Sequence, residues 1–171
     1  GADIWGTADE FQFPHRTLTG DGNLVARVNT ITNPNVWSKI GLMVRESLAA
    51  GSRHGTMFLA AGRGASFQYR TNNGGSSAGD NGDNVLTLPR WIRVERAGNV
   101  VRGYFSTNGV NWTQRGTVTL TGLPSTVYVG LAMTSHLDGT LATATLDSVS
   151  LNPVTPPEVD TTPPTVPCRP L

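Results

Sequence analysis

Cysteine, lysine and charged residues in general are scarce in this sequence. Cys168 is the single cysteine among 171 residues, which excludes an internal disulfide and a zinc site built from cysteines. Lys39 is the single lysine, so twelve of the thirteen basic residues are arginines, which suit planar or bidentate hydrogen bonding. Charged residues make up 15% of the chain, against roughly 25% in an average soluble domain. The polar surface must therefore come largely from uncharged side chains.

The sequence also lacks an excess of either charge and lacks long apolar runs. Thirteen basic and twelve acidic residues give a net charge of +1, which offers no strong attraction to nucleic acid or to an anionic membrane surface. No apolar run approaches the roughly 20 residues that span a bilayer. We therefore expect neither nucleic acid nor membrane as a partner.

Proline is concentrated at one end of the chain. Residues 153–171 hold seven of the eleven prolines, together with several threonines. Because proline removes backbone donors and favours extended conformations, this segment predicts a stiff linker. We therefore expect one domain over residues 1–151, followed by a Pro/Thr-rich linker over residues 152–171 that leads to a further domain.

Residues 1–151 are divided into short runs that favour strands. Several alternate between apolar and polar residues, and pairs such as Asn73-Gly74 and Asn108-Gly109 between them favour tight hairpin turns. The runs are Leu24–Val28, Gly41–Ser47, Thr56–Ala61, Ser66–Arg70, Trp91–Arg96, Val100–Ser106, Thr117–Leu120, Val127–Thr134 and Leu141–Leu151. Many short strands without helices between them predict an all-β protein, an antiparallel β-sandwich or jelly roll.

Alternation along these runs gathers polar side chains on one face of a sheet. Residues of successive strands that share this face are Arg45, Gln68, Arg70 and His136, with Arg93 and Trp91 as further candidates. Such a face suits carbohydrate, because Arg, Gln and His exchange hydrogen bonds with hydroxyl groups and an indole ring stacks on the apolar face of a pyranose.

The four tryptophans are the candidate stacking platforms. Trp37 follows a loop-like stretch, Asn33-Pro34-Asn35-Val36, and Trp5 lies near the chain start, so either could present its ring to a sugar. Trp91 and Trp112 are expected to serve packing. The carbohydrate-binding set predicted from the sequence is Trp37, Arg45, Gln68, Arg70, His136 and Trp5.

The acidic residues suggest two other kinds of site, a catalytic pair and a calcium site. Hydrolysis of a glycosidic bond normally needs two carboxyl groups, and Glu46 and Glu95 are the only glutamates in strand-like runs. Each has an arginine beside it in sequence, which favours a structural ion pair. Asp80 and Asp83, in the polar loop Asn72–Asn84, are a weak candidate for binding calcium as a structural ion. We expect no other cofactor.

Taken together, several segments resemble a family of bacterial extracellular β-sandwich domains of the concanavalin A-like lectin/glucanase type, related to the DUF1349 group. The segments are Gly1–Gly6, Gly20–Gly22 with Leu24–Val28, Gly41–Ser47, Phe67–Arg70, Asn108–Trp112, Val129–Ala132 with Ser135-His136, and Leu146–Val149. The resemblance implies two antiparallel sheets, of which the concave one often binds sugar. The acidic cluster of the catalytic relatives has no counterpart here, which favours binding over cleavage.

Three hypotheses on function follow. The first is a non-catalytic carbohydrate-binding module that is an accessory domain of a secreted, multidomain bacterial protein, with a polysaccharide or oligosaccharide and the neighbouring domains of the same polypeptide as partners. The second is a glycoside hydrolase on the same sandwich that uses Glu46 and Glu95. The third is a structural spacer without a ligand.

Overall fold

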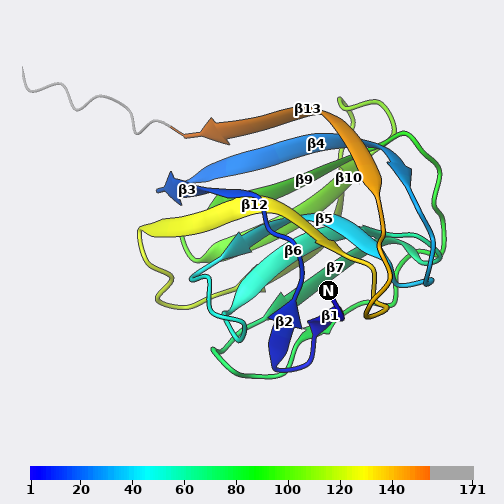
Figure 1. Ribbon diagram of the computed structural model, residues 1–171. Helices are drawn as coiled ribbons and strands as arrows, with labels where there is room; N and C mark the ends of the chain where they lie inside the picture. The colour runs from blue at the N-terminus through cyan, green and yellow to red at the C-terminus, as the bar shows by residue number, and fades with distance from the viewer. Residues whose placement is uncertain (155–171) are drawn as a thin grey trace, which may run out of the picture.

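The computed structural model describes residues 1–154, which form two stacked antiparallel sheets and one small hairpin (Figure 1). The six-stranded sheet runs in the order β3 (His15–Thr19), β12 (Thr126–Thr134), β5 (Lys39–Arg45), β6 (His54–Ala60), β7 (Gly64–Arg70) and β8 (Ala78–Gly79). The five-stranded sheet runs in the order β11 (Thr113–Thr119), β10 (Val100–Ser106), β9 (Arg90–Ala97), β4 (Gly22–Ile31) and β13 (Ala144–Pro153). The strands β1 (Asp3–Trp5) and β2 (Ala8–Glu10) pair only with each other.

The main hydrophobic core lies between the two sheets. In β4 and β9 buried and partly exposed residues alternate, because one face of the five-stranded sheet packs inward and the other meets solvent. The six-stranded sheet contributes residues such as Leu42, Met57 and Phe67 to the same core. Gly103 and Gly116 of the facing sheet leave room for the Phe67 ring, since a Cβ atom at either position would collide with it.

The outer face of the six-stranded sheet is covered as well. All seven residues of β5 and all seven of β6 are buried, which one packed face alone would not produce. The second cover is the N-terminal segment, in which the β1–β2 hairpin and the chain that follows it cross this face (Figure 1). A second apolar cluster joins them, made of Ile4, Met43, Phe58 and Ala132 with Phe11 and Phe13 packed against it.

The fold class predicted from the sequence is confirmed, and each predicted run overlaps a strand. The last strand continues two residues past the predicted domain boundary, to Pro153. Proline is tolerated there because β13 is an edge strand. Apart from residues 152–154, the predicted linker lies outside the described residues, as does Cys168. Within residues 1–154 there is no helix that is long and apolar enough to cross a membrane.

Candidate functional site

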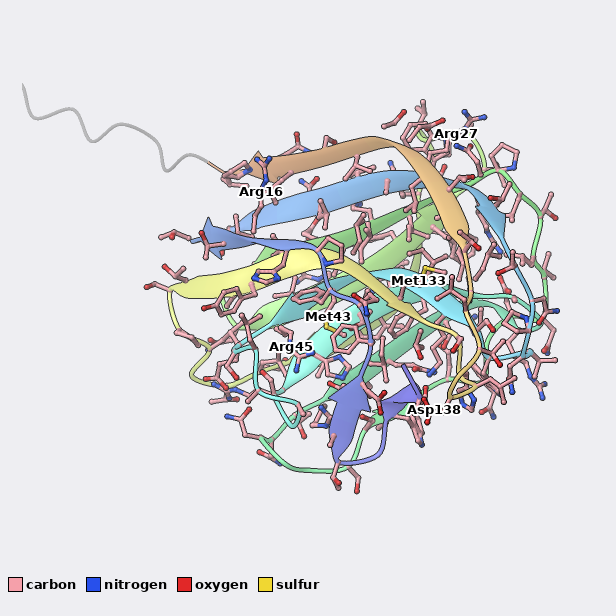
Figure 2. All side chains as sticks on the ribbon, in the orientation of Figure 1. Arg16, Arg27, Met43, Arg45, Met133 and Asp138 are labelled. Atoms are coloured by element: carbon pink, nitrogen blue, oxygen red, sulfur yellow. The ribbon has the colours of Figure 1, made fainter. Side chains whose placement is uncertain are left out.

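The predicted polar face exists, and it is the outer face of the six-stranded sheet. Leu42 and Val44 point into the main core, so Met43 and Arg45 of the same strand take the opposite side, where the N-terminal segment crosses (Figure 2). Gln68 and Arg70 of β7 share that side, because their neighbours Phe67 and Tyr69 contact the main core. The assignment of faces from alternation therefore agrees with the structure for these strands.

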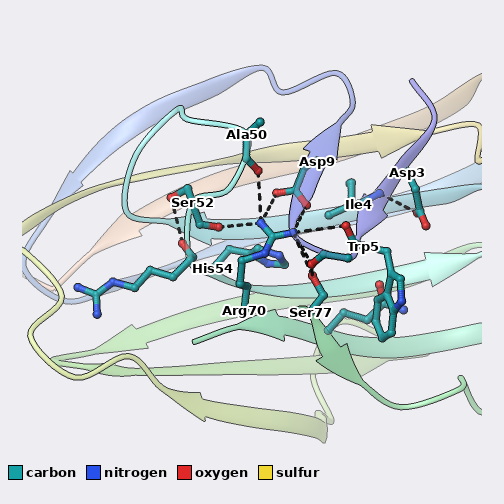
Figure 3. Close-up of polar contacts among 12 residues, drawn as sticks. Asp3, Ile4, Trp5, Asp9, Ala50, Ser52, His54, Arg70 and Ser77 are labelled. Carbon is teal, nitrogen blue, oxygen red and sulfur yellow. Dashed lines mark hydrogen bonds and ion pairs between the residues drawn. The ribbon is translucent and has the colours of Figure 1, made fainter. Parts of the chain in front are cut away.

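The β1–β2 hairpin covers part of this face and is attached to it through the carboxylate of Asp9. Arg70 donates from Nη1 to Asp9 Oδ2 over 2.9 Å and from Nη2 to Asp9 Oδ1 over 2.6 Å (Figure 3). The same guanidinium also donates to the carbonyl oxygens of Ser52 and Gly6. Arg45 Nη1 lies 3.4 Å from Asp9 Oδ2. Asp9 thus balances two arginines at once, and it reaches them because Gly6, at φ 62°, turns the chain between β1 and β2.

Solvent does not reach these arginines. The exposed fraction is 0% for Arg70 and 1% for Arg45. Burial lowers the pKa of the Arg45 guanidinium, Asp9 raises it and Arg70 lowers it further. The open arginine-bearing surface expected from the sequence is therefore a buried layer in this structure, because the N-terminal residues fold back over it.

Two hollows remain on this face. The one at the Arg45 end has a volume of about 360 Å³ and is lined by Asp9, Glu10, Phe11, Phe13, His15, Arg45, Leu48 and Ala50. The one at the Lys39 end has a volume of about 220 Å³. Its lining comes from β1, from the turn before β5, from β5 and β7, and from the loops that follow β8 and β12. The residues are Asp3, Trp5, Trp37, Lys39, Gln68, Asp80, Asn81 and His136.

Lys39 lies at the base of the hollow and is almost fully buried. Its Nζ donates to Asp3 Oδ1 at 2.9 Å, to Gln68 Oε1 at 3.0 Å and to the carbonyl oxygen of Ile4 at 3.2 Å. The ammonium also lies 5.8 Å from the Trp5 ring centre and 5.5 Å from that of Trp37, within cation–π range. Burial lowers the pKa of Lys39, and the charge and hydrogen bond of Asp3 oppose that shift. Lys39 therefore fixes the hairpin and both indoles relative to the sheet.

Asp3 joins this lysine to a histidine. Asp3 Oδ2 lies 3.1 Å from Nε2 of His136, whose side chain is one third exposed. His136 lies two residues beyond the end of β12 in a left-handed conformation, with φ 54°. Trp37 is held by a turn, in which its backbone N–H donates to Asn35 Oδ1 at 2.9 Å. Trp5 is 42% exposed, so part of its ring is open to a ligand.

The structure brings together four of the six residues that the sequence predicted for carbohydrate binding. Trp5, Trp37, Gln68 and His136 line the hollow, whereas Arg45 and Arg70 lie under the hairpin. The sequence reasoning missed Asp3, Lys39 and Asn81. Lys39 carried a usable signal, because alternation back from Arg45 through Met43 and Gly41 places the single lysine on the same face.

The remaining tryptophans lie at the other sheet, Trp91 on β9 and Trp112 immediately before β11. Trp91 and Arg93 are on β9, so they do not share a face with Arg45 and Arg70, contrary to the expectation. The Arg93 guanidinium stacks 4.2 Å from the Tyr104 ring centre and 4.7 Å from that of Trp112. Trp112 therefore has a packing role, as expected.

The two candidate catalytic glutamates do not share a site. Arg53 donates from Nε and Nη2 to the Glu46 carboxylate at 2.7 and 2.8 Å, and its hydrogen bond is the largest cause that lowers the pKa of Glu46. Glu95 lies in the other sheet, where it pairs with Arg102 at 3.2 Å. Each glutamate therefore forms the expected ion pair, with an arginine other than its sequence neighbour.

The carboxylates of Asp80 and Asp83 do not fit a calcium site. Asp83 accepts from the N–H groups of Ala65 and Val85 and from Arg90. Asp80 accepts from the N–H groups of Phe67 and Gly82 and from Arg115. Both are thus already surrounded by donors. Within residues 1–154, no group of three or more His, Cys, Asp or Glu could hold a metal ion.

Comparison of the sequence alone gives no relatives: no protein-family model and no curated protein matches the chain. The structure does match solved structures. One is a functionally unknown protein from Saccharomyces cerevisiae, with a TM-score of 0.68 and 18% identity over 90% of this chain and 84% of that one. Another is a mutant of the GH43 protein BlXynB from Bacillus licheniformis, with a TM-score of 0.62 and 13% identity over 78% of this chain. This match covers only 28% of the GH43 protein.

A third similar structure is the exoplasmic/lumenal domain of VIP36 in its Ca2+/Man3GlcNAc-bound form. Its TM-score is 0.55 and its identity 15%, over 93% of this chain and 80% of that one. At such low identities the matches establish the fold alone. The chain therefore has an antiparallel, concanavalin A-like β-sandwich, the fold class expected from its sequence.

Proposed function

We propose that this domain is a non-catalytic carbohydrate-binding module and that the hollow lined by Trp5, Trp37 and Lys39 is its binding site. The observation that carries the proposal is the placement of two indole rings around one polar hollow at the Lys39 end of the sheet face. An indole offers a sugar an apolar surface, and the neighbouring polar groups offer hydrogen bonds to its hydroxyls.

The polar groups of the hollow are of the kinds that sugars need. Asp3, Asp80 and Asn81 provide oxygen acceptors, while the amides of Gln68 and Asn81 and the His136 ring provide donors. Their charges are largely compensated, since Asp3 pairs with Lys39 and Asp80 with Arg115. A site whose charges are already paired favours a ligand without strong charge, such as a neutral saccharide.

The wider setting belongs to the same proposal. We place the module in a secreted bacterial protein of the DUF1349-related type, where it would hold a polysaccharide while a neighbouring domain acts on it. The similar structures include a GH43 protein and the VIP36 exoplasmic/lumenal domain, which is bound to Man3GlcNAc. They support a carbohydrate ligand and leave its identity to experiment.

Affinity electrophoresis against a panel of plant, algal and microbial polysaccharides tests the proposal. At least one glycan should retard the intact chain, and Trp5→Ala should weaken that retardation about fivefold to tenfold, because a stacking contact contributes roughly 1 kcal/mol. Trp112→Ala is the matched control, since Trp112 stacks on Arg93 of the other sheet. Retardation by no glycan, or equal loss in both variants, would contradict the proposal.

A further inference from the structure

We infer that the hollow binds the end of a saccharide chain, one or two sugar units, and does not hold the middle of a long chain. The inference rests on the proposed function and adds to it the form of the ligand. Its basis is the way in which the hairpin divides the face of the six-stranded sheet.

The hollow is small. Its volume of about 220 Å³ lies below the roughly 300–1,000 Å³ of sites that enclose drug-sized ligands. Side chains surround it in several directions. Asp3 and Trp5 come from the hairpin, Trp37 from the turn before β5, Asn81 from the loop after β8 and His136 from the loop after β12.

Beyond the hollow, the outer face of the six-stranded sheet continues along β5. From Lys39 to Arg45 strand β5 advances six residues, roughly 20 Å at about 3.3 Å per residue, a length that could seat several sugar rings. The middle of that length is filled, and the hollow of about 360 Å³ at its Arg45 end shares no lining residue with the hollow at Lys39. Ile4 of the hairpin packs in this middle part with Met43, Phe58 and Ala132, and all four have no exposed surface.

The hairpin is held to the sheet by several kinds of contact. Beyond the apolar cluster, Asp9 pairs with Arg70 and Arg45 in the buried layer described above. The N–H of Asp9 donates to the carbonyl oxygen of Ala50, and the N–H of Ser77 to that of Gly6. A polysaccharide cannot displace the hairpin without breaking these contacts, so the groove ends at Trp5 and Asp3.

The consequence for the ligand is geometric. A unit inside a long chain continues through a glycosidic bond on both sides, whereas a terminal unit continues on one side only. The hairpin wall removes one of these two directions. Asp3 and His136 at that wall would then meet a terminal hydroxyl group where an internal unit would carry its next sugar.

Calorimetric titration of the intact chain with saccharides of increasing length tests the inference. The probes are methyl glycosides of glucose, mannose, galactose, xylose and arabinose, and the gluco-, manno-, galacto-, xylo- and arabino-oligosaccharides of two, four and six units. For the sugar that binds, we expect the dissociation constant to change less than about threefold between two and six units. Trp5→Ala should weaken the two-unit and six-unit ligands by the same factor, and Trp112→Ala should weaken neither.

The possible failures are distinguishable. An affinity that rises about tenfold or more between two and six units would overturn the inference and leave the proposed function intact. Binding of none of the saccharides and of no polysaccharide would remove the proposed function and the inference with it. Partial hydrolysis of a bound polymer gives a second readout, because the number of binding sites per gram of polymer should rise with the number of chain ends.

Discussion

Arg70 of β7 and Asp9 of β2 face each other with two parallel hydrogen bonds, of 2.9 and 2.6 Å, and neither side chain has any exposed surface. Two N–H groups therefore meet two carboxylate oxygens in a bidentate pair that bulk solvent does not reach. The pair joins residues that are 61 positions apart and ties the N-terminal hairpin to the large sheet.

Breaking this pair should destabilise the protein strongly. Arg70→Ala leaves the Asp9 carboxylate with only the more distant Arg45, so we expect the free energy of unfolding to fall by about 3–5 kcal/mol. Arg102→Ala, which removes a partly exposed partner of Glu95, should cost no more than about 1 kcal/mol. Urea unfolding of both variants measures the difference. A loss below about 1 kcal/mol in Arg70→Ala would show that the pair contributes little net stability.

His54 should make stability dependent on pH on the acid side of neutrality. Its ring is fully buried, with Nδ1 bonded to Thr56 Oγ1 at 2.9 Å. Burial first, and then the charges of Arg70, Arg45 and Lys39, hold its pKa well below the ordinary 6.5. The folded protein therefore keeps His54 neutral while the unfolded chain takes up a proton below about pH 6.5. The free energy of unfolding therefore does not depend on His54 protonation above that pH. Below that pH it falls, by up to about 1.4 kcal/mol per pH unit.

Urea unfolding at pH 7.5, 6.5 and 5.5 measures this effect. We expect His54→Gln to remove most of the loss between pH 6.5 and 5.5, whatever its stability at pH 7.5. Thr56→Val keeps the imidazole and should keep the slope. If His54→Gln retained the full slope, another group would be responsible for it.

The sequence predicted the strands well because their signal is local. In β5 the order Leu42, Met43, Val44, Arg45 alternates between two faces, and alternation alone is enough to place Arg45 and, two strands away, Arg70 on one face. The segment that covers that face is held there by contacts between residues far apart in the sequence. Strands β1 and β2 have three residues each, too few to show a period, and Asp9 meets its arginine across 61 residues.

The site was predicted in part for the same reason. Alternation along the strands predicts Gln68 and His136, the loop-like stretch before it predicts Trp37, and Trp5 is predicted from its place near the chain start. Tertiary contacts bring the four together. Lys39 was noted only as the single lysine, because nothing local shows that Asp3 would reach it from the chain start. A charged side chain on a strand that is buried on both faces implies a partner of opposite charge, which is the signal that could have identified it.

Glu46 is expected to stabilise the fold and not to act as a catalytic acid. A general acid needs a raised pKa, whereas hydrogen bonds from Arg53 and Asn73 lower that of Glu46. Its stabilising contribution is therefore present above the unfolded pKa of about 4.5 and is lost as the pH falls through the lower folded value. Glu46→Gln should be less stable by about 1–2 kcal/mol at pH 7, and the difference should shrink below pH 4.5.

Thermal unfolding of wild type and Glu46→Gln across pH 3 to 7 measures that difference. Reducing-end assays on the same samples test the hydrolase alternative directly. Release of reducing ends that disappears in Glu46→Gln, with the melting temperature unchanged, would support catalysis and contradict the structural role.

Calcium should not stabilise this protein through Asp80 and Asp83. Asp83 Oδ1 accepts two backbone N–H groups and Oδ2 accepts from Arg90 at 3.0 Å. Burial opposes ionisation of Asp83, yet these bonds and the Arg90 charge lower its pKa, so its charge is already used within the fold. A chelator or millimolar calcium chloride should therefore leave the melting temperature within about 1 °C, whereas a tight site would raise the unfolding free energy by roughly 3 kcal/mol. Asp83→Ala should lower the melting temperature by several degrees with or without calcium, because the N–H groups of Ala65 and Val85 lose their acceptor. A melting temperature that rises with calcium in the wild type and not in Asp83→Ala would instead identify this loop as a metal site.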